Sequence, residues 1–153
     1  MSLLGSQAPD FTLINNEKNH VTLSGLRGQK VVLAFFPAAF TGVCSKEMCT
    51  FRDSMASFND VGATVFGISV DAPFSTDAFA KANDLNFHLL SDHDRSTVKA
   101  YGVALNNFGG MNGYIAAQRA VFVVDESGSV AYEWVAPNPG VEPDYEAVKA
   151  AAS

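Results

Sequence analysis

Both cysteines of the chain lie in one short stretch, FFPAAFTGVCSKEMCTF, which covers residues 35–51. A thiol is a nucleophile in its ionised form, so the surroundings of Cys44 and Cys49 decide whether either residue can do chemistry. An apolar run precedes the stretch, and Pro37 predicts that this run ends there as a strand. Thr41 suits the N-cap of a helix, which places Cys44 in the first helical turn. Unpaired backbone N–H groups and the helix dipole favour a thiolate at that position.

The residue pattern leaves two interpretations of Cys44 open. The first is a reactive thiol, because α/β proteins build their sites at the carboxyl ends of the central strands. The second is a small buried hydrophobic residue, which is a common role for cysteine in a protein core. Position alone does not decide between them.

Hydrophobic periodicity predicts several strands. Continuous apolar runs suit central strands that are covered on both faces, and such runs occur at 31–36, 63–70 and 120–125. The turn DESGS joins the last of these to 130–135, which predicts a β-hairpin. A shorter hairpin is predicted near the N-terminus, where FTLIN precedes HVTLSG.

Helical patterns fall between and after these strands. The apolar residues of the first pattern recur at spacings of four, three, four and three, which forms one helical face: Cys44, Met48, Phe51, Met55 and Phe58. Further helices are predicted at 75–84, 94–102 and 142–152. The alternation predicts an α/β protein whose central sheet is covered by helices on both sides. The segment 105–118, rich in glycine and asparagine, predicts a long loop of the kind that is often functional.

Length and composition exclude several classes of protein. A chain of 153 residues can bury one core, so we expect a single domain over 1–153. With 48% hydrophobic and 17% charged residues, a folded chain is expected rather than a disordered one. The net charge of −6 disfavours partners such as nucleic acid and anionic lipid. The start, MSLLGSQAPD, lacks the features of a signal peptide, and no apolar run approaches a membrane span of about 18 residues, so a cytoplasmic location is expected.

A metal site is disfavoured. The histidines, His20, His88 and His93, are scattered and have no metal-ligand spacing with the cysteines. A zinc site made of both thiols and a histidine is conceivable, but the cysteines do not form the C-x-x-C pair that such sites commonly use.

The motif P-A-A-F-T-G-V-C, from Pro37 to Cys44, resembles the Pro-x-x-x-Thr-x-x-Cys signature of the peroxiredoxins. Most of the chain is similar to this family: GSQAPDFTL resembles its opening segment, VFGISVD its second central strand, FHLLSD a later segment, and QRAVFVVDESG its arginine-bearing strand and turn. Within the family the chain resembles the alkyl hydroperoxide reductase E-like and bacterioferritin-comigratory groups. The resemblance implies a thioredoxin-like α/β fold, with a mixed central sheet flanked by helices and an N-terminal β-hairpin.

The resemblance implies a thiol-dependent peroxidase that reduces hydrogen peroxide and organic hydroperoxides without a metal or organic cofactor. Cys44 matches the peroxidatic cysteine, whose thiolate attacks a peroxide oxygen and becomes a sulfenic acid. Thr41 matches the threonine that contacts the reacting atoms, and Pro37 the proline that shields the site from water. Arg119 matches the arginine directed at the thiolate and the peroxide. Glu47, one turn beyond Cys44, is expected to support the site by orienting an arginine.

Each of these residues also has a purely structural interpretation. Thr41 suits an N-cap, Pro37 a strand end, Arg119 a strand-end side chain that points into water, and Glu47 an acid that complements the helix dipole. The resemblance further implies a homodimer and a thiol reductant: thioredoxin, a glutaredoxin-like protein or a low-molecular-weight thiol.

Cys49 is a candidate resolving cysteine. On an intact helix the side chains of Cys44 and Cys49 point roughly 140° apart, and their Cα atoms lie about 8–9 Å apart. A disulfide tolerates about 7 Å. Either Cys49 is structural and an external thiol resolves the sulfenic acid, or the start of the helix unwinds and Cys49 attacks Cys44. A cysteine at this spacing recurs in the bacterioferritin-comigratory group, which favours the resolving role.

Two other functions stay open. One is a thioredoxin-type thiol–disulfide oxidoreductase, which is disfavoured because four residues separate the cysteines where that chemistry uses two. The other is a non-catalytic redox sensor or holdase, in which oxidation of Cys44 acts as a switch.

Overall fold

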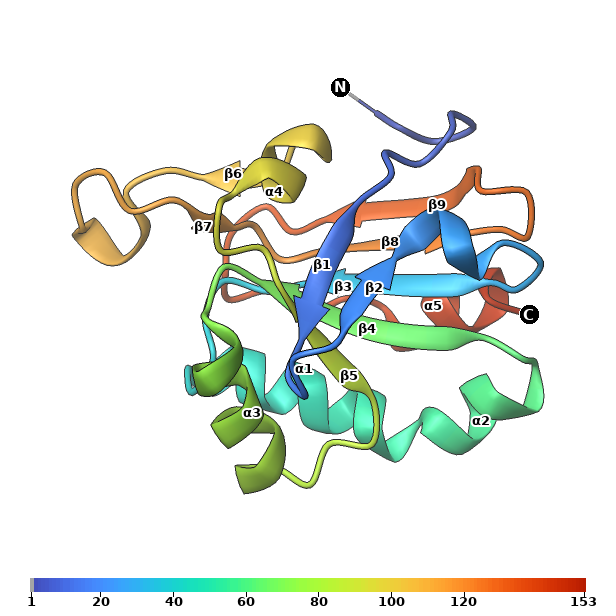
Figure 1. Cartoon of the computed structure of the whole chain (residues 1–153), viewed down its shortest axis with the longest axis horizontal. Helices are drawn as coiled ribbons and strands as arrows, with labels where there is room; N and C mark the ends of the chain where they lie inside the picture. The colour runs from blue at the N-terminus through green and yellow to red at the C-terminus, as the bar shows by residue number, and fades with distance from the viewer. Residues whose placement is uncertain (1) are drawn as a thin grey trace.

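A computed structural model describes residues 2–153, and most of their strands form one mixed β-sheet (Figure 1). In chain order its strands are β1 (Thr12–Asn15), β2 (His20–Thr22), β3 (Val31–Phe35), β4 (Thr64–Ser69), β5 (His88–Ser91), β8 (Ala120–Val124) and β9 (Val130–Val135). Their spatial order is β2-β1-β5-β4-β3-β8-β9. Strands β3, β4 and β5 are parallel, whereas β8 pairs with β3, and β1 with β5, in the antiparallel direction. Antiparallel hairpins therefore close both edges, as the sequence predicts.

Helices cover the two faces of the sheet unequally. The α-helices within residues 2–153 are α1 (Gly42–Asp53), α2 (Met55–Asp60), α3 (Pro73–Ala82), α4 (Ser96–Ala100) and α5 (Tyr145–Ala151). Four of them pack on one face, whereas α4 lies on the other (Figure 1). The face of α4 also carries a two-stranded sheet of β6 (Ala104–Leu105) and β7 (Ala116–Ala117). Short 3₁₀ helices, η1 (Leu23–Leu26) and η2 (Phe108–Gly110), lie in the connections.

The central strands are buried on both faces because their residues alternate between two hydrophobic cores. Along β3, the side chains of Val31, Leu33 and Phe35 belong to the core beneath α4. Those of Val32 and Ala34 belong to the core that α1, α2, α3 and α5 cover. Since successive residues of a strand point to opposite faces, such a strand is apolar throughout, which explains the continuous apolar run.

Three short strands were missed by the sequence analysis. Strand β5 has four residues, of which only Leu89 and Leu90 are strongly apolar, so it produces no recognisable run. Strands β6 and β7 have two residues each and lie at the ends of the predicted loop 105–118. Pairing between them closes this segment into a hairpin, which projects from the body of the molecule (Figure 1).

The helices predicted at 75–84 and 142–152 form as α3 and α5 with slightly shifted ends, whereas the other two predicted helices differ more from the structure. The helix predicted at 94–102 contains only five residues, because Arg95 has a φ of 64° and stands outside the helical region. The buried carboxylate of Asp92 accepts hydrogen bonds from the backbone N–H groups of Thr97 and Val98 and caps α4 instead. The helix that begins near Cys44 is divided into α1 and α2, yet its predicted apolar face is buried along both.

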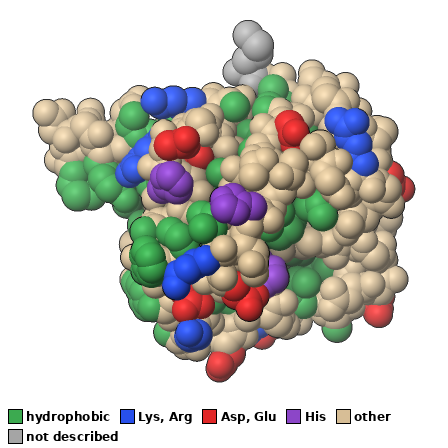
Figure 2. Space-filling view, in the orientation of Figure 1, with side chains coloured by type: hydrophobic (Ala, Val, Ile, Leu, Met, Phe, Trp, Pro, Cys, Tyr) green, Lys and Arg blue, Asp and Glu red, His purple; other side chains and the backbone are tan. Residues whose placement is uncertain are grey.

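Acidic and basic side chains are interspersed on the face of the molecule that Figure 2 shows, and no large area of one sign appears there. This distribution agrees with the net charge in offering nucleic acid no basic stripe on that face. None of the helices within residues 2–153 is both long enough and apolar enough to cross a membrane.

Helix α1 approaches the sheet closely at Gly67 of β4. A Cβ atom at this position would lie 2.6 Å from Leu89 Cδ2, 3.0 Å from Met48 Sδ and 3.2 Å from Phe36 Cε1. Distances this short leave no room for a methyl group between the sheet and the helix. Gly67 therefore determines how near to β4 the helix that carries both cysteines can pack.

Replacing Gly67 should destabilise the fold. We expect Gly67→Ala to lower the free energy of unfolding by about 1–3 kcal/mol, because the added methyl group must displace the packed side chains of Leu89 and Met48. Urea denaturation followed by circular dichroism measures this change. Gly25→Ala is the matched control, since a Cβ atom there would meet nothing within 4 Å. Equal unfolding free energies for the two variants would contradict the expectation.

Candidate active site

The structure places Cys44 at the start of α1, as the sequence predicts. Strand β3 ends at Phe35, buried Pro37 follows in the connection, and α1 begins at Gly42. Cys44 is the third residue of the helix and exposes only 1% of its surface. In the first turn of an α-helix the backbone N–H groups have no partner within the helix, so the thiol lies where a negative charge is favoured.

Thr41 occupies the N-cap position, but its side chain does not cap the helix. Its φ and ψ are extended, and its carbonyl accepts the first helical hydrogen bond from Ser45 N. Its hydroxyl donates instead to the carbonyl of Ala38 at 2.8 Å. The Thr41 hydroxyl is therefore held by the preceding loop and is not committed to the N–H groups of the first turn.

Arg119 reaches Cys44 from the far end of the chain. Because β8 runs antiparallel to β3, the start of β8 lies beside the end of β3, with Ala120 opposite Phe35. Arg119 directly precedes β8 and therefore projects at the edge of the sheet where α1 begins. Its Nη2 donates to Cys44 Sγ at 3.2 Å, and its side chain is 2% exposed. The alternative that Arg119 points into water is wrong.

Glu47 holds the other side of the same guanidinium. Arg119 Nη1 donates to Glu47 Oε1 at 2.7 Å, and the Glu47 side chain has no exposed surface. Glu47 Oε2 is also buried, and it has no hydrogen-bond partner among residues 2–153. The expectation that Glu47 contacts an arginine is met, although one of its oxygens stays unsatisfied.

Burial and charge shift both partners of this ion pair. Burial raises the pKa of Glu47 to about 7, with a further contribution from the Glu142 carboxylate, while the Arg119 guanidinium opposes the shift. Burial also disfavours the charge of Arg119, but Glu47 and Cys44 outweigh it, so the net shift of the Arg119 pKa is upward. Arg119 therefore remains charged, and Glu47 is the group whose protonation changes near neutral pH.

Two further contacts organise the site, and the sequence analysis identified neither. The carbonyl of Pro139, between β9 and α5, accepts hydrogen bonds from Arg119 Nε at 3.0 Å and Nη2 at 2.9 Å. The carboxylate of Asp71, just beyond β4, accepts from the backbone N–H of Ala39 at 2.9 Å and from the Ser69 hydroxyl at 2.7 Å. A backbone carbonyl leaves no signal in a sequence, whereas a polar residue directly after a buried strand does.

The loop before α1 is conformationally constrained at Phe40. This residue has a φ of 65°, a region that non-glycine residues rarely adopt, and 60% of its surface is exposed. Its ring packs edge-on against that of Phe79, with the centroids 5.2 Å apart. Backbone strain of this kind commonly accompanies functional sites.

Cys49 also lies on α1, but its thiol contacts a different part of the structure from that of Cys44. Both cysteines are free thiols, and the helix is continuous from Gly42 to Asp53. Cys49 Sγ donates to Asn83 Oδ1 at 3.5 Å, and Arg52 Nη1 donates to the Asn83 carbonyl at 2.6 Å. The C-terminal half of α1 is therefore attached to the end of α3, and Cys49 faces that attachment.

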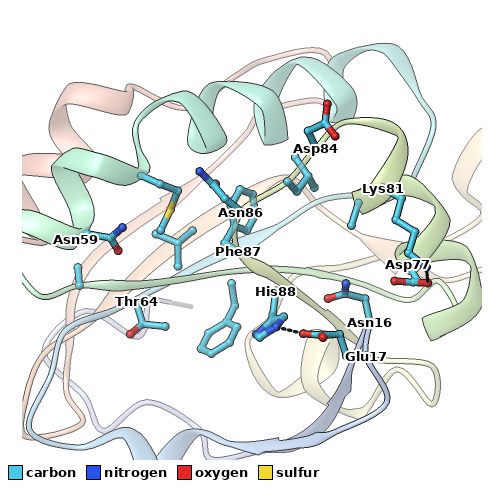
Figure 3. A pocket seen from close by; sticks show the side chains of 16 residues that line it. Asn16, Glu17, Asn59, Thr64, Asp77, Lys81, Asp84, Asn86, Phe87 and His88 are labelled. Atoms are coloured by element: carbon cyan, nitrogen blue, oxygen red, sulfur yellow. Dashed lines mark hydrogen bonds and ion pairs between the residues drawn. The ribbon is translucent and has the colours of Figure 1, made fainter.

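A larger cavity than the one beside Arg119 lies elsewhere in the molecule. It has a volume of about 670 Å³ and is lined by Asn16, Glu17, Asp77, Lys81, Asn86 and His88, among others (Figure 3). Its lining includes the starts of β4 and β5, and these strands are parallel to β3, so it opens at the edge of the sheet opposite to Cys44. A cavity of about 120 Å³ does lie against Arg119, beside Gln118 and Pro139.

Among residues 2–153, no group of three or more histidine, cysteine, aspartate and glutamate side chains is arranged to hold a metal ion. One of the histidines, His88, instead pairs with Glu17 in the lining of the cavity of about 670 Å³ (Figure 3).

Comparison with known proteins agrees with this geometry. The model of the AhpC/TSA family matches residues 4–133. A Haemophilus influenzae protein named putative peroxiredoxin bcp is 40% identical over 128 residues, which are 83% of this chain and 82% of the relative. The crystal structure of peroxidoxin BcpB from Mycobacterium tuberculosis has a TM-score of 0.85 at 31% identity and covers 99% of this chain and 96% of its own. A structure of the Xanthomonas campestris bacterioferritin comigratory protein has a TM-score of 0.81 at 26% identity, with coverages of 93% and 89%.

These similarities first define the class of protein, an α/β enzyme of the thioredoxin-like fold whose chemistry depends on thiols. The chain belongs to the AhpC/TSA family of peroxiredoxins, and within it to the Bcp and peroxiredoxin Q type. It is therefore a thiol peroxidase that reduces peroxides. The family, fold and activity that the motif at 37–44 implies are confirmed.

The protonation of Glu47 should make the stability of the fold depend on pH. With a pKa near 4.5 in the unfolded chain and about 7 in the folded protein, Glu47 binds a proton more tightly when folded. The protonated carboxyl group therefore stabilises the folded protein, fully below about pH 4.5. As the pH rises to about 7 this contribution is lost, and the free energy of unfolding falls by up to about 3 kcal/mol. Glu47→Gln stays neutral, so it should gain stability relative to the wild type between about pH 5 and 8.

Urea denaturation at several pH values measures this difference. Glu126→Gln is the matched control, because Glu126 is exposed in the turn at the end of β8 far from Arg119, and its replacement should bring no such gain. A constant difference between wild type and Glu47→Gln across this pH range would contradict the expectation.

Proposed function

We propose that Cys44 is the peroxidatic cysteine of this peroxidase. The observation that carries the proposal is the 3.2 Å contact between Arg119 Nη2 and Cys44 Sγ inside the protein. A permanent positive charge at this distance stabilises a thiolate, and the start of α1 adds unpaired N–H groups. The thiolate attacks the terminal oxygen of the peroxide, the O–O bond breaks, and Cys44 becomes a sulfenic acid as water or an alcohol leaves.

Thr41 and Pro37 complete the proposed site. The Thr41 hydroxyl uses its hydrogen in the bond to Ala38, so its oxygen is free to accept a hydrogen bond from the peroxide. Pro37 is buried and has no N–H group, which keeps the connection between β3 and α1 from attracting water. Glu47 supports the site by orienting the Arg119 guanidinium.

Cys49 is proposed to resolve the sulfenic acid. Its sulfur attacks that of Cys44, an S–S bond forms, and water leaves. Because α1 is intact and Cys49 faces Asn83, this step requires the first turns of α1 to unwind and Cys49 to leave α3. Resolution by an external thiol is the alternative.

The proposal extends to substrates and partners. Hydrogen peroxide and organic hydroperoxides are the proposed substrates, supported by the alkyl peroxide reduction named for the Xanthomonas campestris protein. The reductant is a thiol, supplied by thioredoxin, a glutaredoxin-like protein or a low-molecular-weight thiol. We infer a single peroxiredoxin domain over 1–153, a cytoplasmic location and a homodimer. The exposed ring of Phe40, next to Thr41, supports a dimer contact around the catalytic entrance.

Replacing each cysteine tests the proposed roles. Cys44→Ser should abolish peroxide reduction, because an alcohol is a poor nucleophile at neutral pH. Cys49→Ser should still be oxidised at Cys44 but should accumulate sulfenic acid and over-oxidise. Intact mass after one equivalent of peroxide, followed by thiol alkylation and peptide mapping, distinguishes these products. Full activity of Cys44→Ser would exclude the proposed role of Cys44. If the wild-type protein accumulated a sulfenic acid at Cys44 while Cys49 could still be alkylated, the proposed role of Cys49 would be excluded.

Weakening the contact between α1 and α3 should accelerate resolution. Asn83→Ala removes the acceptor of the Cys49 thiol and keeps the carbonyl that Arg52 contacts. Loss of one hydrogen bond worth about 1 kcal/mol should raise the rate of disulfide formation about fivefold. Rapid acid quenching and mass spectrometry measure this rate. Asn86→Ala is the control, because Asn86 contacts the carbonyl of Arg52 and not Cys49; an equal acceleration there would contradict a specific role for Asn83.

A further inference from the structure

Two acidic groups share one guanidinium inside the active site. Arg119 Nη2 contacts Cys44 Sγ at 3.2 Å, and Arg119 Nη1 contacts Glu47 Oε1 at 2.7 Å. All three side chains are buried, so no water screens their charges effectively. One positive charge compensates only one negative charge, and a second buried anion would be costly. The geometry therefore opposes the simultaneous ionisation of Cys44 and Glu47.

The unsatisfied oxygen of Glu47 indicates which group holds the proton. An ionised carboxylate would leave Oε2 charged and without a partner among residues 2–153. A proton on Oε2 removes this charge, and Oε1 still accepts the hydrogen bond from Arg119. Burial raises the pKa of Glu47 to about 7, which agrees with a proton held near neutral pH.

The surrounding groups offer no second cation to Glu47. Lys46, its neighbour on α1, pairs with Glu142 at 3.1 Å. Glu142 lies close enough to raise the pKa of Glu47, and the Tyr145 hydroxyl donates to Glu142 at 2.6 Å. Of the described groups that face Glu47, Arg119 alone favours its ionised form.

We propose that Glu47 holds a proton while Cys44 is a thiolate and releases it when Cys44 becomes a sulfenic acid. This inference rests on the proposed role of Cys44. Before the reaction the trio formed by Cys44, Arg119 and Glu47 carries a thiolate, a guanidinium and a neutral carboxyl group. After the reaction it carries a neutral sulfenic acid, the guanidinium and a carboxylate. The net charge of the buried trio is zero in both states.

The proton released by Glu47 balances the one that the leaving group takes up. The thiolate forms an S–O bond with the terminal oxygen of R–O–O–H, and the O–O bond breaks. The sulfur is oxidised by two electrons, the peroxide is reduced by two, and RO⁻ leaves. RO⁻ takes one proton to become ROH, while Glu47 loses one. The coupling is electrostatic, because the Arg119 guanidinium that joins Glu47 to Cys44 does not itself give up a proton.

Counting protons during oxidation tests this inference. The Cys49→Ser variant stops the reaction at the sulfenic acid, and thiolate absorbance identifies a pH at which Cys44 is ionised. Stopped-flow mixing with hydrogen peroxide in weak buffer, with a pH-indicator dye, then measures proton uptake. We expect nearly no uptake for Cys49→Ser and about one proton per oxidised Cys44 when Glu47→Gln is added. Glu126→Gln, in the exposed turn at the end of β8 far from Arg119, is added as the control and should leave the uptake near zero.

Infrared difference spectroscopy supplies a readout that does not require Glu47 to be substituted. Oxidation of Cys49→Ser should remove the band of a protonated carboxyl group and produce that of a carboxylate. Equal proton uptake with and without Glu47→Gln, or an unchanged carboxyl band, would overturn the inference while leaving Cys44 as the peroxidatic residue. A Cys44 thiol that stays alkylatable after peroxide would overturn both the proposed function and this inference.

Discussion

The burial of one guanidinium is the constraint on which the active site depends. A buried charge is costly unless it is paired and hydrogen-bonded, and Arg119 meets that requirement with three different groups. Glu47 supplies a carboxyl oxygen, Pro139 a backbone carbonyl and Cys44 a sulfur. Cys44 and Glu47 lie on α1 and Pro139 lies between β9 and α5, so the guanidinium is held in one position only when β8, α1 and the segment before α5 are all in place. Removing any one of these partners would leave a buried charge less well compensated.

The sheet makes this arrangement possible through register and close packing. Antiparallel pairing of β3 with β8 brings the end of one strand beside the start of the other, and hence Arg119 beside the entrance of α1. Gly67 lets α1 lie close against β4, which sets the depth of Cys44 below the surface. Asp71 holds the loop before α1 through the N–H of Ala39. The position of the Cys44 thiol is thus set by the strands and by one loop anchor, and its surroundings combine the start of α1 with the Arg119 guanidinium.

Because α1 presents Cys44 to a buried cation, it is poorly suited to bring Cys49 to Cys44. Five residues along an intact helix turn the two thiols away from each other, and Cys49 is engaged with α3 through Asn83. The hydrogen bonds that stabilise α1 therefore oppose any disulfide within it. The proposed roles of the two cysteines therefore need different states of α1: an ordered helix that keeps Cys44 against Arg119, and a locally unwound one in which Cys49 can reach Cys44.

Local signals in the sequence determined the α/β class, the central strands β3, β4 and β8, the helix entrance at Cys44 and the family, because each depends on residue types at short spacing. Short strands such as β5 and β6 were missed, since two to four residues do not form a period. Thr41 was assigned the correct position, but the partner of its hydroxyl depends on the turn of the preceding loop. Only the tertiary structure decided that Arg119 is shared by Cys44 and Glu47 and that a carbonyl of Pro139 holds it. It also decided that one Glu47 oxygen has no hydrogen-bond partner within residues 2–153. Those contacts join residues up to 75 positions apart, and strand register and helix packing, rather than neighbouring sequence, bring them together.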